Sequence, residues 1–192
     1  MLLKKYQMEG VKMEIKINLA SLNDLEGICD VAQDVFPQDF DFENGFDRQQ
    51  CKYLFSTAIN DTNESLFIAK TGEEIVGFAY YINKPPTNGT AILEMIGVKK
   101  KLQGQGIGLR LLLDSEHIFV KECENRRIKL ATIHLSTGGD NPVGQKLYLK
   151  AGYEKIADIP GFVGDGNLEL FMLKKISDTK YRTGLWNKAE QC

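Results

Sequence analysis

The chain has 192 residues, of which 43% are hydrophobic and 26% charged, and its formal net charge at pH 7 is −2. This length and composition predict one folded domain with a full hydrophobic core and exclude a disordered chain. The slight acidic excess argues against a general nucleic-acid-binding protein, because such proteins usually carry a basic excess.

The first half of the chain predicts a strand, two helices and a hairpin. Alternating and helical spacing of apolar residues, with turn residues between them, carries this prediction. In chain order, we expect a strand at residues 13–19, a helix from an N-cap at Ser21 or Asn23 to Pro37, a second helix at residues 48–59, and a hairpin of two strands around the turn at Thr71 and Gly72.

The second half predicts a strand–helix–strand crossover followed by a short helix and two strands. We expect a strand at residues 90–98, an amphipathic helix of about four turns after a glycine-rich loop, a strand within residues 128–136, a helix at residues 141–151 stopped at Gly152, and strands near residues 153–157 and 168–174. For the amphipathic helix, the spacing predicts a buried face of Leu109, Leu112, Leu113, His117 and Val120, with Glu116 pointing elsewhere.

This order of elements predicts an α/β fold of the α+β type. A meander followed by one crossover gives a mixed, mostly antiparallel central sheet of about six to seven strands, with helices on both faces. The four cysteines (Cys29, Cys51, Cys123 and Cys192) are widely spaced and predict reduced, mostly buried thiols in the cytoplasm. We expect no metal site, no membrane span and no secretion signal.

The glycine-rich loop "QGQGIG" at residues 103–108 is the most distinctive local sequence. Gly104 and Gly106 permit positive φ angles and a close approach to backbone amides. The helix that begins here also presents unpaired N–H groups and the positive end of its dipole, which together favour a phosphate or pyrophosphate. The loop lacks the Gly-Lys-Ser/Thr of a Walker motif, and Leu109 replaces the third glycine of a Rossmann fingerprint. From these features alone, the loop is either a simple turn or an anion-binding site.

Two longer motifs carry a family resemblance. Residues 98–108 fit the pattern V-x-x-x-x-Q-x-x-G-x-G, which resembles the acetyl-CoA signature of the GNAT superfamily of N-acetyltransferases. Residues 141–153 resemble the family motif N-x-x-A-x-x-L-Y-x-x-x-G-[FY], with Gly144 in place of the usual Ala. The resemblance covers about residues 13–176, so we expect one GNAT-like domain over residues 1–192 with short terminal extensions.

The resemblance implies roles for individual residues. The loop amides would hold the pyrophosphate of acetyl-CoA, and the preceding strand would bulge and hold the pantetheine arm and the acetyl carbonyl through its amides. Asn141 would meet the pantetheine or thiol side, and Tyr148, whose ordinary pKa is near 10, would protonate the departing thiolate. The implied cofactor-binding residues are Ile96, Gly97, Val98, Gln103, Gly104, Gln105, Gly106, Ile107, Gly108, Leu109 and Asn141, with Gly97 expected at the bulge.

The general base has two candidates. Glu94 interrupts an apolar strand, and alternation places it on the face of Ile92 and Ile96 unless the strand bulges. It is either the catalytic base or a solvated carboxylate. His134 lies on the neighbouring strand and is either a second candidate or a core histidine. Residues 99–101, three lysines in a row, either attract the cofactor's phosphates or form a solvated edge.

The acceptor is suggested only by charge. Residues 21–47 contain eight carboxylates and no Lys or Arg, interleaved near the end with Phe36, Phe40, Phe42 and Phe46. They predict an acidic, aromatic vestibule for a small cationic amine, or else a solvated loop whose rings fill the core. We expect transfer from acetyl-CoA to a primary amine by direct attack in a ternary complex, since no cysteine has a nucleophile's setting. A protein or peptide acceptor (N-terminal or lysine) and a non-catalytic acyl-CoA sensor are the alternatives. A homodimer is possible.

Overall fold

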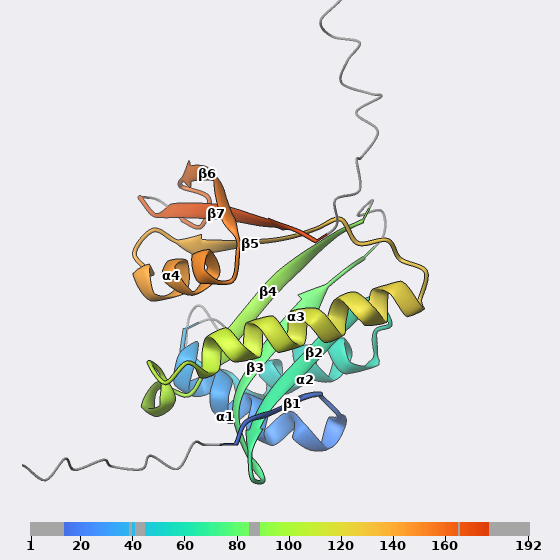
Figure 1. Ribbon diagram of the computed structural model, residues 1–192. Coiled ribbons are helices and arrows are strands. Elements are labelled where there is room, and N and C mark those ends of the chain that lie inside the picture. The colour runs from blue at the N-terminus through green and yellow to red at the C-terminus, as the bar shows by residue number, and fades with distance from the viewer. Residues whose placement is uncertain (1–13, 39, 41–44, 85–88, 165, 177–192) are drawn as a thin grey trace, which may run out of the picture.

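The computed structural model describes residues 14–38, 40, 45–84, 89–164 and 166–176 (Figure 1). Strands and helices follow one another in the predicted order. The strands are β1 (Lys16–Leu19), β2 (Glu64–Thr71), β3 (Glu74–Ile82), β4 (Thr90–Val98), β5 (Thr132–Gly138), β6 (Glu154–Pro160) and β7 (Leu168–Lys175). The helices are α1 (Leu25–Val35), α2 (Arg48–Asn60), α3 (Ile107–Asn125) and α4 (Pro142–Lys150), with short 3-10 turns at Leu22–Asp24 and Lys100–Leu102.

The strands form one seven-stranded sheet in the order β1-β2-β3-β4-β5-β7-β6. Every neighbouring pair is antiparallel except β4 and β5, which are parallel and are joined through α3. In Figure 1, α3 crosses one face of the sheet while α1 and α2 lie on the other. The predicted mixed, mostly antiparallel sheet with helices on both faces is therefore confirmed.

Each face of the sheet has its own hydrophobic core. The core under α3 and α4 includes Phe67, Tyr81, Leu111, Leu112, Phe119 and Ile133. The core under α1 and α2 includes Ile28, Phe55, Ile68 and Phe78. Full burial of side chains of this size stabilises the fold by roughly 1.5–3 kcal/mol each, before entropy is counted. Among the described residues, no helix is both long enough and apolar enough to cross a membrane.

Local signals in the sequence fix several helix ends. The side chain of Asp47 accepts hydrogen bonds from the backbone N–H groups of Gln49 and Gln50 and so caps α2. At the end of α4, Gly152 has a φ of 91°, which is the left-handed conformation expected after a helix. The predicted stop of this helix at Gly152 is confirmed.

The predicted buried face of α3 was partly wrong: Leu109, Leu112 and Val120 do pack in the core, but two of the predicted residues do not. The helix has 19 residues, more than the four turns expected, and Leu113 and His117 are exposed. The residues that face the core are Ile107, Leu111, Leu112, Ser115, Glu116, Phe119 and Cys123. Glu116 is buried because it forms an ion pair with Lys174 of β7 and accepts a hydrogen bond of 3.2 Å from the Tyr153 hydroxyl. A partner 58 residues away thus places this carboxylate inside.

We expect Glu116→Gln to lower the free energy of unfolding by about 2–3 kcal/mol, because it leaves the mostly buried ammonium of Lys174 without its counter-charge. Urea unfolding followed by circular dichroism measures this. The matched control is Glu74→Gln, which removes an ion pair with Lys99 and Lys101 on the exposed surface and should cost less than about 1 kcal/mol. Equal losses in the two variants would contradict the structural role of Glu116.

Candidate active site

The sheet opens between β4 and β5. Their pairing covers only Thr90–Ile92 against Thr132–His134, after which the two strands diverge (Figure 1). Beyond this point β4 is still paired with β3 on its other side, as far as Val98. The last part of β4 therefore has one edge without a neighbouring strand, and such an edge offers backbone groups to a ligand.

The open edge carries two amides that point outward. The N–H of Lys99 donates to the carbonyl of Val76 on the β3 side, at 2.9 Å. Because successive amides of a strand point in opposite directions, the N–H groups of Val98 and Ile96 point away from β3, toward the gap left by β5. The structure thus places two of the predicted cofactor-binding amides at the open edge.

The bulge in β4 does not lie where it was predicted. Tyr80 pairs with Met95 and Tyr81 pairs with Leu93, so Glu94 is the extra residue. Gly97 does not lie at the bulge. A side chain is disfavoured there because a Cβ would lie 3.0 Å from the Phe36 ring. The bulge also shifts the alternation, which was predicted for a strand without one: Ile96 packs on the α3 side of the sheet.

The glycine loop connects β4 to α3 and has unpaired amides. Gly104 and Gly106 have φ angles of 77° and 82°, and no atom lies within 4 Å of a Cβ built on either. Across Gly104–Leu109, no backbone N–H donates a hydrogen bond to any described residue; the first amide to do so is that of Arg110, to Gly106. The Gln103 side chain donates to the carbonyl of Val98 at 3.0 Å and closes the turn.

These consecutive amides form a cradle for an anion. The first N–H groups of a helix have no partner within the helix, so this partly exposed run of free amides is available to water or to an anionic ligand. The dipole of the 19-residue helix α3 adds positive potential at the same place. The residues present fit a pyrophosphate such as that of coenzyme A. The neighbouring Lys99 and Lys101 form ion pairs with Glu74, so their charges are already partnered at the protein surface.

Tyr148 lies on α4, in the core below β5. Its side chain is 9% exposed, and its ring packs edge-on against Tyr153 with centroids 6.1 Å apart. Its hydroxyl makes no hydrogen bond to a described residue, and among these residues no buried side-chain oxygen lacks a partner, so the hydroxyl reaches accessible space. Burial raises the pKa of Tyr148 to about 12, which keeps the group protonated at neutral pH.

Asn141 has a structural task. Its side-chain oxygen accepts from the Gly144 N–H at 2.9 Å and caps α4, while its amide nitrogen donates to Thr137 at 3.1 Å. The carboxamide thus holds the helix of Tyr148 to the end of β5. Its predicted contact with pantetheine is not tested by these bonds and stays a prediction.

The two candidate bases lie close to the point where the strands part. Glu94 is exposed and has no hydrogen bond or ion pair with a described residue, while its charge acts on His134 of β5. Burial lowers the pKa of His134, although a backbone hydrogen bond at Ala91 and the charge of Glu94 act in the opposite direction. The imidazole is therefore neutral at pH 7 and can accept a proton.

The face of β5 and β7 that looks away from α3 and α4 carries a further carboxylate. Ile133, Leu135 and Met172 point into the α3-side core, so alternation puts His134 and Glu169 on the opposite face. The Glu169 side chain has no hydrogen bond or ion pair with a described residue although the residue is 9% exposed. No local pattern indicates Glu169, because its position depends on the register between β5 and β7.

Most of the described acidic segment is neutralised by structural contacts. Asp24 pairs with Lys70, Glu26 and Asp30 pair with Arg48, Asp34 accepts from the backbone of Lys100, and Asp47 caps α2. The rings of Phe36, Phe40 and Phe46 pack with one another or with core aromatics. Asp39, Phe42 and the other two carboxylates of the predicted vestibule lie outside the described residues.

The open mixed sheet, with an amide-lined loop at the start of its crossover helix, is the fold of the solved acetyltransferase structures described below. The model of the acetyltransferase (GNAT) family matches residues 25–153, and the chain belongs to this family. No curated protein sequence matches the chain.

Solved structures share the fold at low identity. A putative GNAT-family acetyltransferase from Desulfovibrio desulfuricans is 18% identical with a TM-score of 0.67, over 85% of this chain and 100% of that one. The ribosomal-protein-S18-alanine N-acetyltransferase from Escherichia coli is 19% identical with a TM-score of 0.65, over 88% and 98%. A chimera of spermidine N-acetyltransferase SpeG from Vibrio cholerae and hSSAT is 16% identical with a TM-score of 0.68, over 84% and 95%.

Proposed function

We propose that this protein is an acetyl-CoA-dependent N-acetyltransferase that modifies a primary amine by direct attack in a ternary complex. The observation that carries the proposal is the run of free amides from Gly104 to Leu109 beside the open edge of β4. Family membership supports the reaction class. Direct attack is favoured because the described cysteines are all buried, away from this loop and edge.

Each group has a chemical task in this reaction. The amides of Gly104–Leu109 hold the pyrophosphate, and those of Ile96 and Val98 hold the pantetheine arm and polarise the acetyl carbonyl. Bound acetyl-CoA supplies the activated thioester. Glu94 removes a proton from the incoming ammonium, and Tyr148 donates its own to the departing sulfur.

We further propose a small cationic amine as the acceptor. The carboxylates of Glu94 and Glu169 form no ion pair with a described residue. Both lie on or next to the side of the sheet opposite α3 and α4. Two such groups attract a diamine more strongly than a neutral amine. The spermidine acceptor named for one structural neighbour is of this class.

A peptide amine is the second candidate. Apolar side chains on and around the β6–β7 hairpin are exposed, namely Ile156, Ile159, Phe162, Val163 and Leu168. A peptide could bury such residues, and the acceptor named for another neighbour is a ribosomal protein.

The test has two stages. Acetyl-CoA should raise the melting temperature of the protein by several degrees, since it binds only the folded chain. Release of free thiol is then followed over diamines, neutral alkylamines and short peptides with free N-termini. Preference for diamines supports the first acceptor and preference for peptides supports the second. An absence of any stabilisation by acetyl-CoA would refute the whole proposal.

The identity of the base is tested by a pair of variants. We expect Glu94→Gln to lower kcat/KM by about 100-fold, since it removes a general base, with the Kd of acetyl-CoA unchanged. His134→Gln should lower kcat/KM by less than about threefold. Because the pKa of His134 is lowered from its ordinary value, the activity of the wild type should show no inflection from this ring between pH 7 and 8. The reverse order of the two losses would assign the base to His134.

A further inference from the structure

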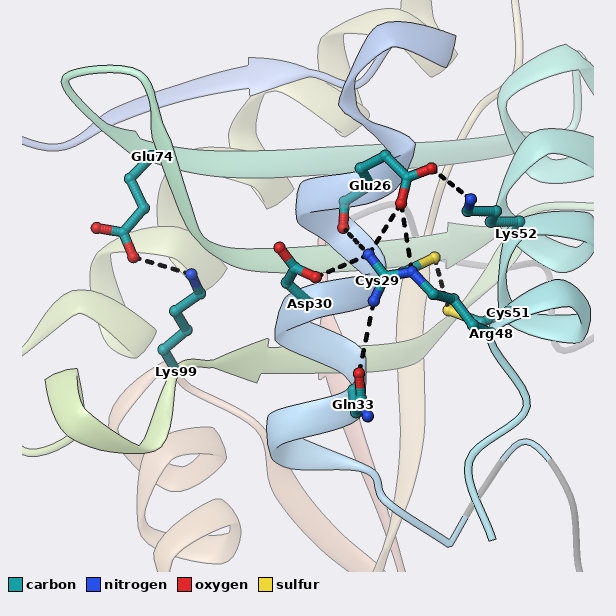
Figure 2. Close-up of polar contacts among 9 residues, drawn as sticks. All are labelled: Glu26, Cys29, Asp30, Gln33, Arg48, Cys51, Lys52, Glu74 and Lys99. Atoms are coloured by element: carbon teal, nitrogen blue, oxygen red, sulfur yellow. Dashed lines mark hydrogen bonds and ion pairs between the residues drawn. The ribbon is translucent and has the colours of Figure 1, made fainter. Parts of the chain in front are cut away.

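Two thiols meet between α1 and α2, far from any role in the proposed reaction. Cys29 and Cys51 are both fully buried, and their Sγ atoms lie 3.0 Å apart, with the Cys51 thiol donating to Cys29 (Figure 2). A disulfide bond is about 2.05 Å long, so the two sulfurs are within roughly 1 Å of bonding distance. Both residues belong to stable helices that face each other.

Positive charges of α2 lie next to the pair. Figure 2 shows the guanidinium of Arg48 bonded to Glu26 and Asp30, at 2.9 and 2.7 Å, and Lys52 paired with Glu26. The hydrogen bond from Cys51 lowers the pKa of Cys29; burial opposes this, and the charge of Arg48 lowers it further. As the donor, Cys51 has a raised pKa. Cys29 is therefore the more readily ionised sulfur of the pair, and Cys51 is the donor of the hydrogen bond.

The third described cysteine lacks this arrangement. Cys123 of α3 is fully buried, and its Sγ accepts from Arg126 and Asn83 at 3.8 and 3.7 Å. No other thiol of the described residues contacts it, and burial raises its pKa. It provides a control for buried thiols within the same chain.

We propose that Cys29 and Cys51 form a reversible oxidation site, at which hydrogen peroxide converts the two thiols to a disulfide that joins α1 to α2. The Cys29 thiolate attacks one peroxide oxygen and the O–O bond breaks. Cys29 becomes a sulfenic acid, and the released hydroxide takes up a proton to form water. The sulfur of Cys51 then attacks the Cys29 sulfur, and the S–O bond breaks. The hydroxide that leaves takes the Cys51 proton as a second water. Peroxide is small and uncharged, which suits a pair with no exposed surface.

The bond would restrain the unfolded chain. Cys29 and Cys51 are 22 positions apart, so the disulfide closes a loop of intermediate length. Closure of such a loop in the unfolded state raises the melting temperature of a protein of this size by about 5–10 °C when the native geometry accepts the bond. Small-molecule thiol reductants should break the disulfide and remove the stabilisation with it.

The experiment uses the full chain with the substitution Cys192→Ser. Cys192 lies outside the described residues, and its replacement prevents an intermolecular disulfide at this position. Folded protein is treated with stoichiometric peroxide, quenched in acid, alkylated in denaturant and measured by intact and peptide mass spectrometry. We expect a loss of about 2 Da, a Cys29–Cys51 cross-linked peptide, an alkylated Cys123 and a higher melting temperature. Dithiothreitol should reverse the mass loss, the cross-link and the rise in melting temperature, and Cys123 should be alkylated in every sample.

The control variants separate the pair from general oxidation. Cys51→Ser should abolish both the cross-link and the thermal shift, whereas Cys123→Ser should keep both. Recovery of both thiols as alkylated cysteines after peroxide treatment would overturn the proposal. A bond that forms only in denaturant, or a melting temperature that falls on oxidation, would overturn it as well.

Discussion

Replacing Tyr148 with Phe is expected to lower kcat by about 100-fold while leaving the Kd of acetyl-CoA within about twofold of the wild type. The hydroxyl makes no bond to a described residue, so its removal costs no internal contact, and the ring can keep its packing on Tyr153. What is lost is the proton donor, whose pKa of about 12 keeps it protonated over the working range. Steady-state thiol release and calorimetric binding give the two quantities.

The same variant separates an enzyme from a binding module. If the protein only senses acyl-CoA, the Tyr148→Phe variant should bind acetyl-CoA normally, and neither the variant nor the wild type should show a transfer rate. The structural control is Tyr153→Phe, which deletes the hydroxyl bonded to Glu116 and keeps the aromatic pair. It should reduce stability slightly and kcat by much less than Tyr148→Phe. If both variants lose kcat equally, Tyr148 is not the specific acid.

Replacing Gly106 with Val should raise the Kd of acetyl-CoA by about 30-fold, equivalent to roughly 2 kcal/mol. Gly106 has a φ of 82°, which a β-branched residue adopts only with strain, so the loop relaxes and its amides lose their alignment. No atom lies within 4 Å of the added Cβ, so a clash is not the cause of the loss. Isothermal titration calorimetry measures the change.

The chain contains a matched control for this strain. Gly161 in the β6–β7 connection has a φ of 70° and likewise nothing within 4 Å of a built Cβ. Gly161→Val should destabilise the fold by a similar amount, about 1–2 kcal/mol, and leave the Kd of acetyl-CoA unchanged. Equal losses of affinity in both variants would show that the effect is global, and the cradle would then have no specific part in binding.

Much of the fold could be predicted because its signals are local. The turn at Thr71 and Gly72 and the glycine after α4 each act within a few residues, and the hairpin and the helix end that they predict are present. The glycine loop could also be recognised, since the positive φ angles and the helix start that it needs lie in consecutive residues.

The errors concern contacts between distant segments. The bulge at Glu94 is defined by pairing with β3, and a strand's own sequence does not record its register. The burial of Glu116 depends on Lys174, and the meeting of Cys29 with Cys51 depends on how α1 and α2 pack. These features arise from tertiary structure, so helical or strand periodicity alone gave either the wrong face or no signal.

The short pairing between β4 and β5 has a consequence for how the molecule opens. Within the described part of the chain, the strand pairing between the sheet's two halves covers Thr90–Ile92 and Thr132–His134, while β5, β6 and β7 are extensively paired with one another. Amide hydrogens at Thr90–Ile92 should therefore exchange with solvent earlier than those in the centre of β2 and β3. The β5–β7–β6 unit can then separate as a cooperative piece below the global unfolding free energy. Hydrogen exchange would resolve two units within what is one continuous sheet.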